Sequence, residues 1–105
     1  MSYEMAKCKI TVLRRSLDHE LADQYLDVER IVPCEQFTDG QEFIVDHPFY
    51  MPKGFGCSSA WADLRSDVML IASGGNLSWI KPRGTAISAC SDRFRTVFFK
   101  VERID

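Results

Sequence analysis

The stretch GFGCSSAW, residues 54 to 61, places a cysteine after two glycines and just before a pattern typical of a helix. A thiol at a helix N-terminus is activated by unpaired backbone N–H groups and by the helix dipole. Cys57 is therefore predicted to be the most reactive of the four cysteines. The same N–H groups, together with Ser58 and Ser59, could instead bind a carboxylate or a phosphate.

Nucleophilic catalysis by a thiol usually needs a neighbouring base, and the chain contains only two histidines. His19 falls in an acidic segment that is typical of a solvated surface. His47 lies in an aromatic loop upstream of Gly54, so Cys57 with His47 is the candidate catalytic pair. The alternative is that Cys57 packs as a small, partly buried apolar side chain at the helix start.

Three of the cysteines are predicted to lie at element boundaries, from which their side chains can converge. Cys34 falls in a loop, Cys57 at a helix start and Cys90 at a strand end. With His47 or Asp92 as a fourth ligand, these thiolates would suit zinc or an iron–sulfur cluster. None of the spacings is C-x-x-C, however, and free cysteines often pack as small hydrophobic residues.

Charged residues near the C-terminus are further candidates for binding a ligand. Arg95 shares a strand face with Val97 and Phe99, so it is expected to turn inward, where a guanidinium needs an anionic partner. That partner is either Asp92, in a structural ion pair, or a bound anion. The candidate ligand-binding residues are Ser58, Ser59, Trp61, Asp92 and Arg95.

Two periodicities along the chain predict the elements that position these residues. Alternation of apolar and polar side chains predicts strands over residues 7–13, 41–46, 85–91 and 94–103, with a hairpin turn at 92–93. A spacing of three and four residues, from Trp61 through Leu64, Val68 and Ile71, predicts a main helix over 59–73. Ser58 or Ser59 is its expected cap, and Gly74 with Gly75 ends it.

A shorter N-terminal helix is predicted from Ser16, as its cap, to about Glu29. Its apolar stripe consists of Leu17, Leu21, Tyr25 and Val28. The elements together indicate an α+β fold: a small antiparallel sheet, with barrel-like closure as one option, packed by one main helix and this shorter helix.

Length and composition limit the classes of protein to be considered. The 105 residues suit a single domain, 1–105, and the formal net charge of -2 argues against nucleic acid as a partner. No apolar run is long enough to span a bilayer, and the N-terminal residues lack the apolar core of a signal peptide. We therefore expect a cytoplasmic protein, not membrane-bound, with all four cysteines reduced.

Several segments of the chain resemble a family of small, uncharacterised prokaryotic proteins, found often in anaerobes. The matching pieces are KCKITVL, CEQFTDGQEF, GFGCSSAW and ACSDRFRTVFFKVERI, spread over almost the whole length. Arg93 and Thr96 depart from the family pattern, which has a glycine and a proline at these positions, and Gly56 is an extra glycine. The resemblance implies no activity, because the family has none established.

Three functions follow as expectations. The preferred one is a small cytosolic module that binds a small molecule or an ion at a cysteine-containing pocket. The alternatives are a small enzyme that uses Cys57 or an acid–base pair, and an interaction subunit that docks a partner through Trp61, Trp79 and the aromatic loop. Association into a homo-oligomer is compatible with all three.

Overall fold

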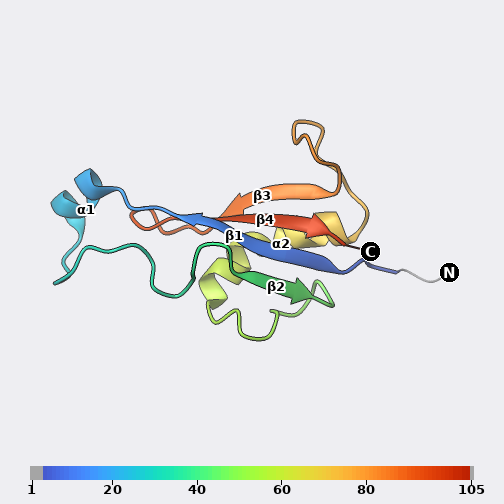
Figure 1. The fold of residues 1–105 in the computed structure, drawn as a ribbon, viewed down its shortest axis with the longest axis horizontal. Helices are drawn as coiled ribbons and strands as arrows, with labels where there is room; N and C mark the ends of the chain where they lie inside the picture. Colours follow the sequence, from blue (N-terminus) through green and yellow to red (C-terminus); the bar gives the residue numbers. More distant parts are fainter. Residues whose placement is uncertain (1–3, 105) are drawn as a thin grey trace.

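The computed structural model describes residues 4–104, which form a four-stranded sheet and two helices (Figure 1). The strands are β1 (Cys8–Arg15), β2 (Glu42–Val45), β3 (Thr85–Ala89) and β4 (Val97–Arg103). The helices are α1 (His19–Tyr25) and α2 (Ser58–Ala72). All paired strands are antiparallel, in the order β2-β1-β4-β3, with β2 and β3 at the edges. The α+β prediction is confirmed, and the sheet is open rather than closed into a barrel.

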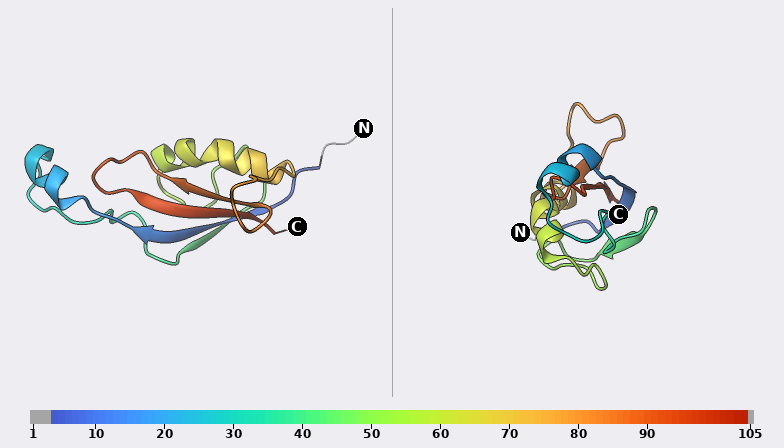
Figure 2. Two further views of the ribbon diagram at one scale, coloured as in Figure 1. Left: turned by 90° about the horizontal axis from the view of Figure 1, so that it is seen from above. Right: turned by 90° about the vertical axis from the view of Figure 1, so that its left-hand side faces the viewer.

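One face of the sheet carries the hydrophobic core. Successive side chains of a strand point to opposite faces, so β1 buries Ile10 and Val12, and β4 buries Phe99 and Val101. Helix α2 lies across this face (Figure 2) and contributes the fully buried Leu64 among others. The stripe predicted for the main helix is therefore its core-facing side.

The opposite face of the sheet is uncovered and carries charged side chains. Lys9 of β1 pairs with Glu42 of β2 at 3.3 Å and with Glu102 of β4 at 3.6 Å. Lys100 lies 3.4 Å from the same Glu102. Lys9 and Glu102 lie directly opposite one another, Glu42 is diagonal to Lys9, and Lys100 shares β4 with Glu102. These pairs explain why the polar positions of the strands need no covering layer.

Helix α1 is shorter than predicted and begins at a different cap. Asp18, not Ser16, accepts the N–H of Leu21 at its carboxylate, and the helix ends at Tyr25. The Ser16 hydroxyl instead donates to the carbonyl of Thr96. Figures 1 and 2 both show α1 far from α2, at the end of the molecule that β1 extends toward. Most of the predicted apolar stripe is consequently exposed, Tyr25 by 70%.

The connection between β3 and β4 is longer than the predicted hairpin turn. The Asp92 carboxylate accepts the backbone N–H groups of Phe94 and Arg95, which takes both groups out of the strand ladder. The carbonyls of Phe94 and Thr96 then bond to the chain that follows β1. Because of these hydrogen bonds, residues 90–96 form a loop instead of strand, and β4 begins only at Val97.

Candidate functional site

Three cysteines from separate segments line one pocket of about 130 Å³, which we call the cysteine pocket. Cys34 lies in the irregular segment before β2, Cys57 directly precedes α2, and Cys90 directly follows β3. All three are partly buried, and none forms a disulfide. Their positions at element boundaries thus bring all three to the lining of one pocket. Ser59, Asp92 and Arg95, also predicted as site residues, line the same pocket.

Each of the three sulfur atoms accepts a hydrogen bond from a backbone N–H group. The donors are Gln36 for Cys34 at 3.4 Å, Ala60 for Cys57 at 3.4 Å and Val97 for Cys90 at 3.3 Å. Such donors stabilise a sulfur atom that carries negative charge, the form in which cysteine acts as a nucleophile or a metal ligand. Each of the three sulfurs in the pocket therefore has one backbone N–H donor that favours negative charge on it.

Cys57 is the N-cap of α2, a position that we predicted for Ser58 or Ser59. Its backbone is extended, and its sulfur takes the place of the serine or threonine oxygen that usually accepts the N–H group in the first turn. Gly56, directly before it, has φ of +76°. A side chain at Gly56 would be strained at this angle and would collide with the amide of Gln36. Gly56 thus allows a close approach to the side chain of Gln36, in the segment that carries Cys34.

The segment with Cys34 is anchored to the end of β1. The Arg15 guanidinium donates to the carbonyl of Cys34 at 3.2 Å and to the carboxylate of Asp39 at 3.0 Å. The hydrogen bond from the Arg15 side chain, with a second from its backbone, lowers the pKa of Asp39. Arg15 thus fixes both ends of an otherwise irregular stretch, which explains how Cys34 keeps its place without a helix or strand.

The loop with Cys90 is held to β4 and to α2. The backbone N–H of Cys90 donates to the carbonyl of Val97 at 3.0 Å, and the N–H of Ser91 donates to the Asp63 carboxylate of α2 at 2.7 Å. The second bond joins the loop to the helix that Cys57 caps. It fixes the position of Cys90 relative to Cys57.

Asp92 and Arg95 form the charged side of the pocket. Partial burial raises the pKa of Asp92, but the backbone N–H groups of Arg95 and Phe94 and the Arg95 guanidinium favour the carboxylate, so its pKa is lowered overall. Arg95 Nε lies 3.3 Å from Asp92 Oδ2. The geometry of this ion pair does not make a hydrogen bond, and the buried Nε has no hydrogen-bond partner among residues 4–104. Arg95 can therefore form the ion pair with Asp92 and still offer its Nε–H to an anion in the pocket.

Aromatic side chains form the apolar base of the pocket. Phe37 lines it and packs against Phe55 and Phe99, with ring centroids 5.0 and 5.2 Å apart. Phe55 comes from the loop before α2 and is 1% exposed. The loop between β2 and α2 thus covers the core in part, because Phe55 is buried while Tyr50 is exposed to solvent.

Three predicted site residues lie elsewhere, and the predicted Cys57–His47 pair is not formed. His47 lines a different pocket, and its Nδ1 accepts the N–H of Phe49 while its ring packs on Tyr50. Ser58 is exposed at the first turn of α2 and is not part of the cysteine pocket lining. Trp61 packs against Phe55, with ring centroids 6.2 Å apart, and lines a different pocket.

Five lining residues were not predicted as site residues: Phe37, Ala60, Asp63, Ser91 and Val97. Helical spacing could have identified two of them, since Ala60 and Asp63 follow Cys57 at intervals of three and share its side of α2. Ser91 lies between Cys90 and Asp92, and Val97 shares a strand face with Arg95, so both had a local signal as well. Phe37 is brought in by its packing against Phe55 and Phe99, for which the sequence carries no local signal.

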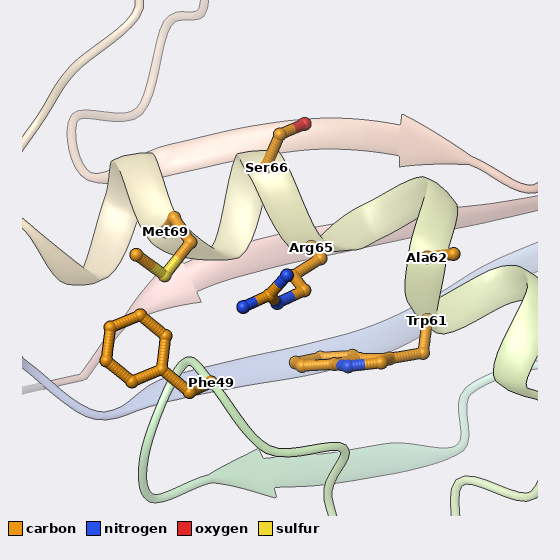
Figure 3. Close-up of a pocket in the computed structure, with 6 residues that line it drawn as sticks. All are labelled: Phe49, Trp61, Ala62, Arg65, Ser66 and Met69. Carbon is orange, nitrogen blue, oxygen red and sulfur yellow. The ribbon is translucent and has the colours of Figure 1, made fainter.

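A larger hollow of about 660 Å³ lies along α2 (Figure 3). Trp61, Arg65 and Met69 of the helix line it, and Phe49 closes one end, with the Arg65 guanidinium 6.0 Å from its ring centroid. Size alone would favour this hollow as the site. We favour the cysteine pocket because the groups able to do chemistry converge there, whereas the hollow has a single charged side chain among mainly apolar ones.

Among residues 4–104, no three or more His, Cys, Asp and Glu side chains form a group that could hold a metal ion. The zinc or iron–sulfur site predicted at Cys34, Cys57 and Cys90 is therefore not found as a preformed group in this range. In the same range, no helix has the length and apolar character required to cross a membrane. Comparison of the chain with family models, curated proteins and solved structures gives no match. The family resemblance of its motifs stays a prediction.

Proposed function

We propose that this protein is a small cytosolic binding module that holds a thiophilic small molecule or ion in the cysteine pocket. The observation that supports this proposal is the convergence of Cys34, Cys57 and Cys90, each with a backbone N–H directed at its sulfur. All four cysteines of the chain are unpaired, which fits a reducing compartment.

Binding is favoured over catalysis because the carboxylates that could act as bases in the pocket already accept hydrogen bonds. The carboxylates of Asp63 and Asp92 line the pocket, but each accepts backbone N–H groups of the loop that follows β3. His47, the imidazole predicted to pair with Cys57, lines another pocket. A cysteine nucleophile would thus lack the free neighbouring base that usually activates it.

An interaction subunit is the less favoured alternative. Trp79 and Tyr50 are strongly exposed, by 75% and 70%. Their loops lie beyond opposite edges of the sheet in Figures 1 and 2, however, which argues against one shared docking surface. Trp61, the third aromatic residue expected to dock a partner, is 8% exposed.

Native mass spectrometry of protein purified without oxygen tests the proposal. The chain is expected to carry excess mass that disappears on denaturation, and Cys34, Cys57 and Cys90 are expected to react more slowly with N-ethylmaleimide before ligand removal than after refolding. The triple serine variant at these positions should lack the excess mass, whereas His47→Gln should keep it. Absence of excess mass, with equal labelling rates before and after refolding, would refute the proposal.

A further inference from the structure

The cysteine pocket combines an apolar wall with one positively charged side chain. Its volume of about 130 Å³ is several times the roughly 30 Å³ that one water molecule occupies in the liquid, so it admits a molecule of several non-hydrogen atoms. Phe37 and Val97, both buried, supply the apolar wall. Among residues 4–104, Arg95 is the one positively charged side chain in the lining.

The Nε–H group of Arg95 lacks a hydrogen-bond acceptor among residues 4–104, although the Nε atom is buried. A buried donor without an acceptor costs free energy, and proteins usually satisfy such a group with another residue, a water molecule or a ligand. The side chain as a whole is 37% exposed, so the guanidinium is not enclosed on all sides and can turn toward a bound acceptor. An acceptor oxygen of a ligand would therefore gain a hydrogen bond that the described protein does not make.

We propose that the ligand of the cysteine pocket is a small organic acid, whose carboxylate binds Arg95 and whose thiophilic centre lies against the cysteines. This inference rests on the proposed function and specifies the class of ligand. A carboxylate matches a guanidinium best, because the two planar groups form paired, charge-assisted hydrogen bonds. Phe37 and Val97 would cover the short carbon chain between the two ends of the ligand.

The two acidic residues of the lining leave this place to the ligand. Asp92 Oδ1 accepts the backbone N–H groups of Phe94 and Arg95 at 2.9 and 2.8 Å, and the Asp63 carboxylate accepts the N–H of Ser91 at 2.7 Å. These bonds fix both carboxylates to the loop after β3 and offset part of their negative charge. Asp92 thereby keeps the Arg95 guanidinium beside the pocket, with Nε 3.3 Å from its Oδ2, and leaves the Nε–H for another acceptor.

The sulfurs and the guanidinium belong to one lining, so a compound that carries both a carboxylate and a thiol-reactive carbon can meet both. Iodoacetate is such a compound, and iodoacetamide differs from it in having an amide in place of the carboxylate. In either reaction the cysteine sulfur bonds to the carbon, iodide leaves, and the thiol proton goes to solvent. A preference of the folded protein for iodoacetate therefore reports a carboxylate held by Arg95.

Parallel labelling of the refolded, ligand-free full chain with the two reagents tests the inference. The rate with iodoacetate divided by the rate with iodoacetamide gives a ratio for each cysteine, and the same chain in urea supplies the intrinsic ratio. At the fastest-reacting cysteine of the pocket, expected to be Cys57, the folded ratio should exceed the unfolded ratio several-fold. Propionate should slow the reaction with iodoacetate to saturation, whereas an equal concentration of chloride should not.

Variants then assign the preference to one side chain. Arg95→Gln should lower the folded ratio to the unfolded value, and Arg95→Lys should retain part of the preference. Arg65→Gln makes the same change of charge outside the cysteine pocket and should leave the ratio unchanged. Far-ultraviolet circular dichroism shows which variants are folded. If Arg95→Gln does not fold, the wild-type ratio and the competition by propionate decide.

Three results would overturn the organic acid: a folded ratio no higher than the unfolded one, a raised ratio that folded Arg95→Gln retains, or labelling by iodoacetate that propionate does not slow. If native mass spectrometry nevertheless shows a ligand that depends on the three cysteines, the organic acid is wrong and the binding function stands. Loss of both results would remove both proposals.

Discussion

The sulfur of Cys57 accepts the backbone N–H of Ala60 at 3.4 Å, so a cysteine serves as the N-cap of the main helix. One side chain therefore has a structural task and a place in the candidate site. Substitutions can separate the two, because a hydroxyl can replace the sulfur as a cap while it is a poor thiophilic ligand.

Cys57→Ser is expected to change the free energy of unfolding little, since serine is a favoured cap. Cys57→Ala removes the acceptor and should lower that free energy by about 0.5–2 kcal/mol. Urea unfolding followed by circular dichroism measures both values. Equal losses for the two variants would show that the capping bond contributes nothing.

Thiol labelling should separate Cys8 from the other cysteines. Burial raises the pKa of Cys8, the positive charge of Arg103 offsets part of this effect, and the side chain is fully buried. In ligand-free folded protein, a brief pulse of iodoacetamide should modify Cys57 first and leave Cys8 unmodified until the chain unfolds. Mass spectrometry of peptides gives the order, and modification of Cys8 before Cys57 would contradict both assignments.

Asp92→Asn should change how stability depends on pH. Since the pKa of folded Asp92 is lowered, its contribution is complete above the unfolded value of about 3.9 and is lost as pH falls through the folded value. The excess stability of wild type over the variant should be constant from neutral pH to about pH 5 and shrink below about pH 4. Urea titrations at each pH test this, and an excess that grows toward acid would contradict it.

Asp63→Ala should loosen the loop that carries Cys90, because the 2.7 Å bond from Ser91 is lost. We expect Cys90 to react several-fold faster with iodoacetamide in this variant, while Cys34, held by Arg15, keeps its rate. Asp63→Asn retains an acceptor oxygen and is the matched control. The same acceleration at Cys34 would indicate general unfolding instead.

Leu64→Ala should test the core under α2. Leu64 is fully buried, so the variant should lose about 2–5 kcal/mol of unfolding free energy. Leu70 on the same helix is 37% exposed, and Leu70→Ala should cost clearly less. Thermal and urea unfolding compare them, and similar losses would show that the burial pattern of α2 is wrong.

Local periodicity was sufficient to predict the sheet and the main helix. The alternation around Ile10 and the spacing from Trp61 to Ile71 depend only on neighbours in the chain, and both elements form as predicted. The boundary positions of Cys34, Cys57 and Cys90 were also visible, because element ends bring side chains to a common surface.

The same periodicity failed where distant contacts decided the outcome. The stripe containing Leu21 and Tyr25 has helical spacing, yet no part of the sheet reaches it, and α1 remains short and largely exposed. His47 is close to Cys57 in sequence, but its ring packs on Tyr50 and it lines a different pocket.

The sequence by itself thus determined which elements form and which cysteines lie at their ends. Only the tertiary structure decided that the three sulfurs share a pocket with Arg95 and Phe37. The reason is that Arg15 holds Cys34, and Asp63 holds the loop of Cys90, through hydrogen bonds between residues 19 and 28 positions apart in the chain. Bonds over such separations depend on how the whole chain packs, and no local pattern encodes them.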